Sequence, residues 1–491
     1  MSASLPHIAQ DPEVDPRNPH HMKVGTLSYT MAGLITLFLF LLWGDFSFSL
    51  METVVPVILP LKLNAIGASN KALGLIVTVI PNVMNLFINP IASFRSDRFR
   101  SRWGRRIPFL AGVTPFLVLF LILLGYSEPI GKMIHGTIFG HKFSETTVLL
   151  WTIGVFMVCF QFFNLFITSI YYYLFNDVVP HAFLARFMAL FRVVGGGAGS
   201  LFNYAVLKYA KTHMQEIFLW AALLYFVAFI VMCLFVKEGE YPPPPPNVDN
   251  KSGLIPSLKT YAVECYSHQF YWFLFLANSF IAMTWASGSF GTLLSTNYMG
   301  YSLDFIGKLG GICGIISMVL LYPAGIIADR FHPLRVQITA ATLQLMIAPF
   351  SIAFTFMRPH FALQTAMHIS IFFSALSLPI GTLGAAAELP VLMKLFPQER
   401  YGQFCSANAL IRSLALIVAG FFCGGFLDFM KTFNPNPDYC YRFVPVWNVF
   451  FNFCSLFFLY KLYRAWKWRG GMQGYVPPQV EPAGASPVLP A

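Results

Sequence analysis

Two acidic residues lie inside the first long apolar segment of the sequence. Asp45 and Glu52 are seven residues apart, so a helix would place both on one face, about 10 Å apart along its axis. Ser49 falls between them on the same face. Because an ionisable group inside a membrane is costly, a carboxyl group kept there is a candidate for function. These two carboxyl groups could bind a proton, or supply oxygen ligands to a sodium ion.

Three further charged residues fall inside later apolar segments, namely Arg192, Glu388 and Arg412. Arg192 is the predicted charge partner of Asp45. Glu388 is expected either to meet Arg412 or to line an inner exit. For all of these charges, the alternative interpretation is a structural ion pair between two helices. Asp428 lies near the end of a segment, where we expect its carboxylate to reach the membrane surface.

Neutral polar and aromatic side chains recur at helical spacing in the other apolar segments. In lipid such groups must face protein or water, so as a set they predict a polar cavity. Amides and hydroxyls can match the hydroxyl groups of a sugar, and an aromatic ring can stack on the apolar face of a pyranose. The alternative interpretation is hydrogen bonding between helices. The predicted cavity residues are Asn82, Asn85, Gln161, Asn164, Tyr171, Trp285, Ser289 and His368.

The elements that must position these residues are membrane-spanning helices. The chain has 491 residues, of which 56% are hydrophobic and only 11% are charged, whereas soluble proteins have roughly 25% charged residues. This composition excludes a soluble enzyme, a disordered protein and an ordinary nucleic-acid-binding protein. A span needs about 20 apolar residues. Twelve segments satisfy this: about 30–59, 72–94, 107–126, 148–176, 187–207, 217–236, 269–297, 305–328, 335–357, 361–392, 402–428 and 443–463.

The distribution of lysine and arginine predicts the orientation of the chain. Most of its 32 basic residues fall in loops and tails on one side if both termini are placed inside. Five consecutive prolines, Pro242 to Pro246, favour an extended linker between the sixth and seventh spans. The predicted parts are a cytoplasmic tail, a six-helix bundle, a cytoplasmic linker, a second six-helix bundle and a cytoplasmic tail. Their bounds are 1–29, 30–236, 237–268, 269–464 and 465–491.

Short sequences recur at corresponding places in the two predicted bundles. Ser96-Asp97-Arg98 ends the second span, and Ala328-Asp329-Arg330 ends the eighth. Similarly, Ala189 to Arg192 in the fifth span matches Ala409 to Arg412 in the eleventh. We therefore expect a duplicated six-helix unit, which is a common design among transporters.

The loop after the second span carries a distinctive run, Ser-Phe-Arg-Ser-Asp-Arg-Phe-Arg-Ser-Arg-Trp-Gly-Arg-Arg-Ile-Pro-Phe over residues 93–109. This run resembles the signature loop of the major facilitator superfamily, although Ser93 stands where the motif begins with glycine. Its particular form resembles the glycoside–pentoside–hexuronide:cation symporters and the sucrose:proton symporters. The segments Asn176 to Pro180 and Pro397 to Gly402 resemble the corresponding loops of that family.

The resemblance implies a cytoplasmic gate. Asp97 would face the start of the eleventh span, where free backbone N–H groups attract a carboxylate. Arg98 or a nearby arginine would pair with Asp177, and such contacts would hold the two bundles closed on the cytoplasmic side. Simple anchoring of a basic loop to the cytoplasmic side is the alternative. The gate residues implied are Asp97, Arg98, Gly104, Arg105, Arg106, Asp177, Arg186, Asp329 and Arg330.

Together these observations predict an all-α integral membrane protein of the major facilitator fold that is not an enzyme. We expect it to be a secondary transporter of a small sugar or glycoside, coupled to H⁺ or Na⁺ at Asp45 and Glu52. No phosphate-binding GxxxxGK[ST] motif occurs, which argues against ATP-driven transport. The alternatives are a symporter of a lysolipid or organic acid, and a non-transporting sensor.

The remaining expectations concern partners and location. We expect no cofactor, no resident metal and no nucleic acid, with the substrate and the lipid bilayer as the partners of a monomer. Short loops suggest a bacterial inner membrane.

Overall fold

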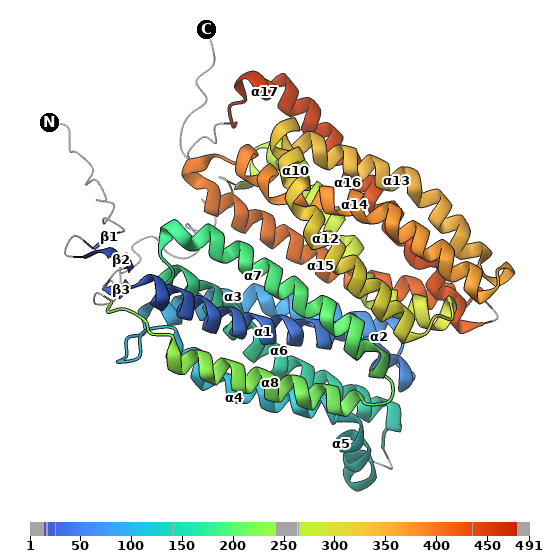
Figure 1. Cartoon of the computed structure of the whole chain (residues 1–491). Coiled ribbons are helices and arrows are strands. Elements are labelled where there is room, and N and C mark those ends of the chain that lie inside the picture. The colour runs from blue at the N-terminus through green and yellow to red at the C-terminus, as the bar shows by residue number, and fades with distance from the viewer. Residues whose placement is uncertain are drawn as a thin grey trace.

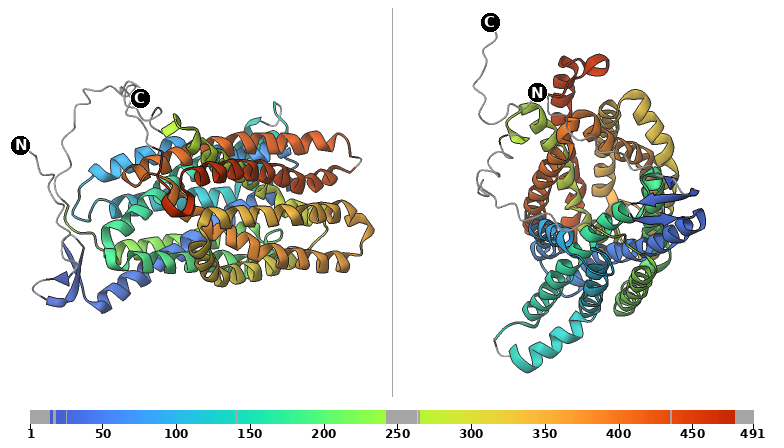
Figure 2. Two further views of the ribbon diagram at one scale, coloured as in Figure 1. Left: turned by 90° about the horizontal axis from the view of Figure 1, so that it is seen from above. Right: turned by 90° about the vertical axis from the view of Figure 1, so that its left-hand side faces the viewer.

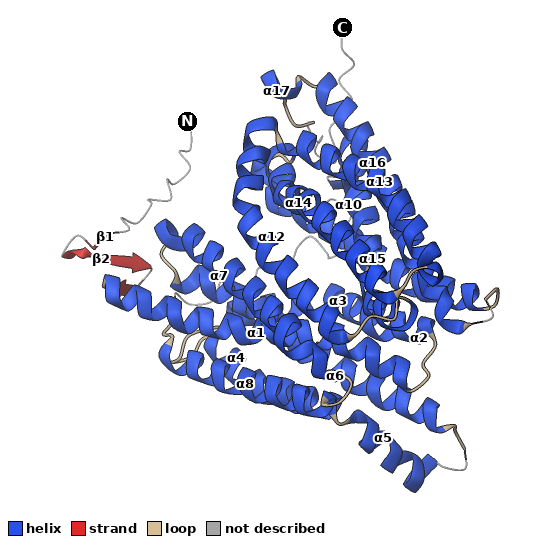
Figure 3. Cartoon of the chain, turned by 45° about the vertical axis from the view of Figure 1, so that its right-hand side comes forward, coloured by secondary structure: helices blue, strands red, loops and turns tan. Residues whose placement is uncertain are grey.

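The computed structural model describes residues 14–15, 18–24, 26–139, 142–241, 263, 265–434 and 436–478. Helices make up nearly all of this, and a small sheet precedes the first long helix (Figure 3). The sheet is antiparallel, in the order β1 (Val14–Asp15), β2 (Asn18–Val24), β3 (Leu27–Tyr29), and it lies in what the sequence predicted as a polar tail. The prolines of the predicted linker lie outside the described residues.

The helices form two groups, which are separated along the sequence and in space (Figures 1 and 2). The first group holds α1 (Met31–Ala65), α2 (Asn70–Gly74), η1 (Leu75–Val79), α3 (Ile80–Arg98), α4 (Ile107–Gly125), α5 (Ser127–Ile134), η2 (His135–Phe139), α6 (Glu145–Val178), α7 (His181–Leu201), η3 (Phe202–Val206), η4 (Leu207–Tyr209) and α8 (Met214–Phe235). The second holds α10 (Gln269–Trp285), α11 (Gly288–Leu293), η5 (Leu294–Tyr298), α12 (Leu303–Phe331), α13 (Pro333–Met357), η6 (Arg358–His360), α14 (Leu363–Leu395), η7 (Gln398–Arg400), α15 (Tyr401–Lys431), η8 (Pro437–Phe443), α16 (Val444–Trp468) and α17 (Gly471–Gly474).

Eleven helical segments of the described chain are long and apolar enough to cross a membrane. The remaining predicted span, 187–207, is helical as well, since α7 continues through η3 and η4 to Tyr209. Its apolar character is diluted by Arg192 and by the glycines at 195–197. The predicted six-and-six arrangement of long helices is therefore present, with one span more polar than the others.

The two groups meet along three pairs of helices. The continuous segment α2–η1–α3 lies against α15, α7 with η3 lies against α12, and α1 contacts α11. Glycines permit the close approach: a Cβ at Gly74 would overlap the carbonyl oxygen of Gly420, and one at Gly307 would overlap that of Asn203. Small residues at such crossings let backbones pack closely in membranes.

Polar contacts join the two groups at the end of the bundle away from both termini (Figure 1). The Asp428 carboxylate accepts hydrogen bonds from the backbone N–H groups of Asn70, at 3.0 Å, and Lys71, at 2.8 Å. The Tyr441 hydroxyl donates to the Asn70 side chain at 3.1 Å. Asp428 was expected to reach the membrane surface, but it instead caps the first helical turn of α2.

Packing at this end predicts a sharp difference between two adjacent glycines of α15. A Cβ at Gly424 would overlap the carbonyl of Asn70, whereas nothing lies within 4 Å of one at Gly425. Gly424→Ala should therefore destabilise the folded protein by roughly 1–3 kcal/mol. Gly425→Ala should change stability by less than about 0.5 kcal/mol.

Thermal unfolding of the two purified variants checks this prediction. Equal unfolding temperatures would mean that the two helix groups are not packed this closely in the dominant conformation.

Candidate functional site

Asp45 is fully buried on α1, at 0% exposure. One carboxyl oxygen accepts a hydrogen bond from the Ser49 hydroxyl at 3.2 Å, and the other has no hydrogen-bond partner among the described residues. Helix α7 covers the carboxyl group at Gly195, where a Cβ would lie 2.7 Å from the Ser49 hydroxyl oxygen. A buried carboxylate with an unsatisfied oxygen is costly, and binding of a proton or cation would remove that cost.

Glu52 lies two helical turns further along α1 and is exposed. Its carboxylate accepts a hydrogen bond from the Asn164 amide of α6 at 2.7 Å, so a predicted ion-site residue and a predicted cavity residue are in contact. The Asn164 amide oxygen is buried without a hydrogen-bond partner among the described residues. α1, α6 and α7 thus surround a polar region inside the first helix group.

The predicted ion pair between Asp45 and Arg192 is not formed. Arg192 is exposed on α7, and Asp45 lies beside Gly195, almost one turn further along that helix. Because helical side chains lean toward the N-terminus of their helix, Arg192 extends away from Asp45. The carboxyl group therefore has a hydroxyl and a glycine beside it instead of a guanidinium.

Three predicted residues of the second helix group do lie together. Arg412 on α15 forms an ion pair with Glu388 on α14, with 3.3 Å between nitrogen and oxygen. The Arg412 guanidinium also lies 4.1 Å from the ring centroid of Trp285, at the end of α10. The Trp285 side chain is 52% exposed, so one charged pair and one open aromatic surface form a mixed polar and apolar cluster.

The other predicted cavity residues differ in their surroundings. Ser289 lies 3.4 Å from Thr78 across the contact between the two helix groups, and His368 is exposed on α14. Gln161 is buried on α6. Tyr171 is fully buried and donates a hydrogen bond to the carbonyl of Leu41 at 2.6 Å, so it belongs to the packed interior of the first group and not to a cavity wall.

The predicted asparagines of α3 are linked to its own backbone and neighbours. The Asn82 amide donates to the carbonyl of Thr78 at 2.8 Å, and the Asn85 side chain accepts a hydrogen bond from Asn89. Asn89 in turn accepts a hydrogen bond from Ser169 on α6 at 2.6 Å. At these positions the interhelical interpretation describes at least part of the polar pattern.

Two arginines converge on Asp177 near the end of α6. Arg105 donates two hydrogen bonds to its carboxylate, at 2.9 and 2.6 Å, and Arg106 donates a third at 3.1 Å. Gly104, which precedes them, has a φ of +101°, a conformation suited to glycine. A carboxylate at a helix C-terminus is unfavourable by itself, and the two guanidinium groups offset this.

The remaining predicted gate residues show no comparable cluster. The side chains of Asp97 and Arg98 lie outside the described residues. Arg186, Asp329 and Arg330 are exposed, and each arginine has its guanidinium near a neighbouring phenylalanine ring, Phe183 or Phe331.

Sequence reasoning did not anticipate two charges that hold α4 at both ends. The Glu238 carboxylate accepts hydrogen bonds from the backbone N–H groups of Arg105, Arg106 and Ile107, at 2.9, 2.8 and 2.6 Å. At the other end of α4, the buried ammonium group of Lys62 donates to the carbonyls of Leu124 and Gly125, at 2.8 and 2.6 Å.

Each of these charges has the sign that the helix dipole favours at its end. The Tyr241 hydroxyl donates to Glu238, and burial together with this carboxylate raises the pKa of Tyr241 above its usual value. No local spacing signals either contact, because Lys62 and Glu238 are each distant in sequence from the backbone groups they bind.

The Asp177 cluster predicts a large effect from the loss of one charge. Asp177→Asn removes the carboxylate that two partly buried arginines share, so it should destabilise the protein by on the order of 3 kcal/mol. Asp304→Asn is the matched control, because it breaks an ion pair with Lys308 in which both side chains are exposed. Its cost should be below about 1 kcal/mol.

The unfolding temperatures of the two variants test this. Equal shifts would show that the Asp177 cluster contributes no more than a surface ion pair.

Comparison with known proteins places this geometry in context. The profile of the Major Facilitator Superfamily matches residues 41–420. A bacterial homologue of the human lysosomal transporter Spinster has a TM-score of 0.62 at 16% identity, covering 88% of this chain and 97% of that one. A mutant of the nucleoside transporter NupG has a TM-score of 0.66 at 10% identity, covering 87% and 100%. A D-xylose–proton symporter has a TM-score of 0.61 at 15% identity, covering 87% and 98%. At such identities the likeness concerns the fold.

Proposed function

Because the chain belongs to the major facilitator superfamily, we propose that it carries a small sugar or glycoside across the membrane by symport with a proton or a sodium ion. Family membership makes it a multi-pass membrane transporter and not an enzyme. The proposal includes alternating access between the two helix groups, with both termini in the cytoplasm of a bacterial cell and the chain in its inner membrane.

The observation that carries the coupling proposal is the environment of Asp45. Its carboxyl group is fully buried with one unsatisfied oxygen, so a bound proton or cation would lower the free energy of that conformation. The same stretch of α7 touches both Asp45 and the second helix group: Gly195 lies over Asp45, and Gly196 faces the Met318 sulfur of α12. Ion binding at Asp45 can therefore influence how the two groups pack.

The sugar proposal is supported by the cluster around Trp285. An exposed indole ring can stack on a pyranose, while the adjacent Arg412 and Glu388 offer hydrogen-bond donors and acceptors for hydroxyl groups. Ser289, on the next turns of the same segment, adds a hydroxyl close to Thr78 of the first group. A neutral substrate needs no net charge in the site, and the ion pair provides none.

An organic acid is the second candidate, favoured by Arg192. This arginine is exposed on α7 and has no ion pair among the described residues, so its guanidinium is available to bind a carboxylate. A lysolipid and a non-transporting sensor remain outcomes of the same experiment.

We expect reconstituted protein to accumulate a labelled sugar when a proton or sodium gradient is imposed on the proteoliposomes. The panel contains sugars, glycosides, organic acids and lysolipids, and an ionophore that collapses the gradient should abolish accumulation. Gradient-stimulated uptake of an acid or lysolipid alone would overturn the sugar proposal. Binding without uptake of any compound would identify a sensor.

Asp45→Asn should abolish uphill accumulation, because an amide of the same shape can neither lose a proton nor supply a negative charge to a cation. Exchange of labelled for unlabelled substrate should persist, since it needs no net ion movement. Asp304→Asn, at an exposed carboxylate, is the control and should retain both activities. Undiminished accumulation by Asp45→Asn would remove this residue from the coupling role.

A further inference from the structure

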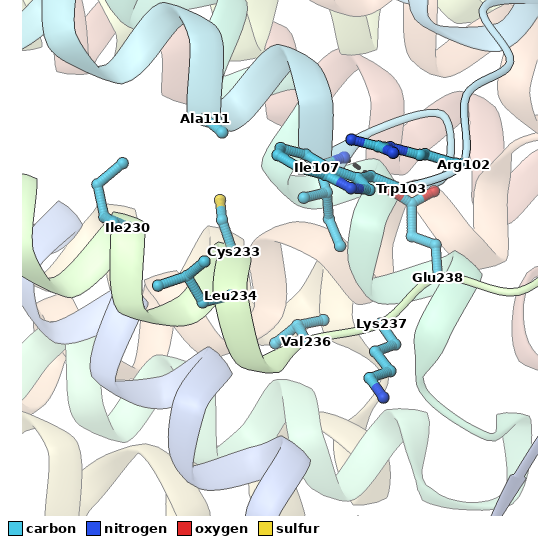
Figure 4. Close-up of a pocket in the computed structure, with 10 residues that line it drawn as sticks. All are labelled: Arg102, Trp103, Ile107, Ala111, Ile230, Cys233, Leu234, Val236, Lys237 and Glu238. Carbon is cyan, nitrogen blue, oxygen red and sulfur yellow. Dashed lines mark hydrogen bonds between the residues drawn. The ribbon is translucent and has the colours of Figure 1, made fainter.

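A groove of about 540 Å³ lies between the start of α4 and the end of α8 (Figure 4). These helices pack against each other on the side of the first group away from the second, and the groove is at the end of the bundle that carries both termini (Figure 1). It is separate from Asp45 and from the Trp285 cluster.

The groove is divided into an apolar part and a charged rim. Ala111, Ile230 and Leu234 lie at the end within the apolar helices, and Leu234 is 70% exposed. Arg102 and Trp103 lie at the opposite end, where α4 begins, with Lys237 on the segment that follows α8. The apolar part therefore faces the lipid tails, and the rim lies at the level of the lipid headgroups.

The charge that the rim presents is positive. Glu238 also lines the groove, but its carboxylate already accepts three backbone hydrogen bonds at the start of α4 and one from Tyr241. Arg102 and Lys237 are both exposed, and neither has an acidic partner within the described chain. Two cations are thus left for a ligand.

Trp103 adds an interfacial aromatic ring to this rim. Its side chain is 57% exposed, and the Arg102 guanidinium lies 5.7 Å from its ring centroid. Tryptophan favours the boundary between hydrocarbon and headgroups because its ring is apolar and its N–H is polar. An exposed indole and two cations above an apolar channel match a phosphate headgroup attached to an acyl chain.

We propose that this groove binds an anionic phospholipid, with its phosphate between Arg102 and Lys237 and one acyl chain along Ile107, Ile230 and Leu234. The lipid would contact both sides of the junction that Glu238 makes with the start of α4. It would thereby hold the loop of Arg105 and Arg106 against the segment after α8. This proposal concerns lipid binding and does not depend on the transported substrate.

Binding is tested with the purified full chain in detergent, by native mass spectrometry and thermal unfolding. Phosphatidylglycerol should bind more tightly and raise the unfolding temperature more than phosphatidylcholine with the same acyl chains. The double variant Arg102→Gln/Lys237→Gln should weaken phosphatidylglycerol binding by about tenfold or more, since each cation near a membrane surface contributes to anionic lipid attraction.

The matched control is Lys208→Gln/Lys211→Gln, which removes two exposed cations at the other end of the first group. It is a close match because Lys208 also rests on its neighbour's ring, 4.8 Å from that of Tyr209. The control should leave phosphatidylglycerol binding unchanged. An equal loss in both double variants would overturn the site, because it would mean attraction to overall charge.

Two further arms separate the headgroup from the chain. Ala111→Trp fills the apolar part without changing charge, and it should also weaken phosphatidylglycerol binding. Glycerol phosphate, which has no acyl chain, should not reproduce the stabilisation. Full stabilisation by glycerol phosphate, or unchanged lipid binding by Ala111→Trp, would contradict a phospholipid site.

Discussion

A charge inside a membrane has no water to stabilise it, so its position is decided by the partners that the protein provides. Most charged groups near the spans of this chain follow that constraint. Lys62 binds two carbonyls at one end of α4, Glu238 binds three amides at the other, and Asp177 is shared by two arginines. These contacts fix the relative positions of α1, α4, α6 and α8.

Asp45 departs from this pattern. It is as buried as any of these groups, yet a single hydroxyl is its hydrogen-bond partner among the described residues. A structural ion would be better compensated, since a half-satisfied buried carboxyl group lowers stability. The imbalance is what a site that binds and releases a cation requires, because a fully compensated carboxylate has no reason to take up a proton.

The contact between the two helix groups relies on a different property, the absence of side chains. Gly74, Gly307, Gly420 and Gly424 bring backbones together at one end of the bundle, and Asp428 adds hydrogen bonds to the start of α2. Close backbone packing over a limited area can be broken and remade as a unit. Transporters that alternate between two openings need a contact of this kind.

The fold could largely be predicted from the sequence because apolar length and charge distribution are local properties. The long helices, their division by a proline-rich segment and the family loop all followed from residues read in order. The site could be predicted only in part. Glu388, Arg412 and Trp285 were each identifiable as unusual for their segment, and the structure brings them together.

The pairing of Asp45 with Arg192 was wrong because opposite charge does not determine which way a helical side chain leans. Tyr171 was misassigned to a cavity because a polar tip gives no sign of whether it meets water or a carbonyl such as that of Leu41.

The sequence by itself determined that this chain spans a membrane many times, that it has two related halves and that a few charges lie inside the spans. Only the tertiary structure decided which of those charges are compensated. Compensation depends on distances between segments that are far apart in sequence: Glu238 reaches Ile107 across 131 positions, and Lys62 reaches Leu124 across 62. Packing sets these distances, and no local pattern records them.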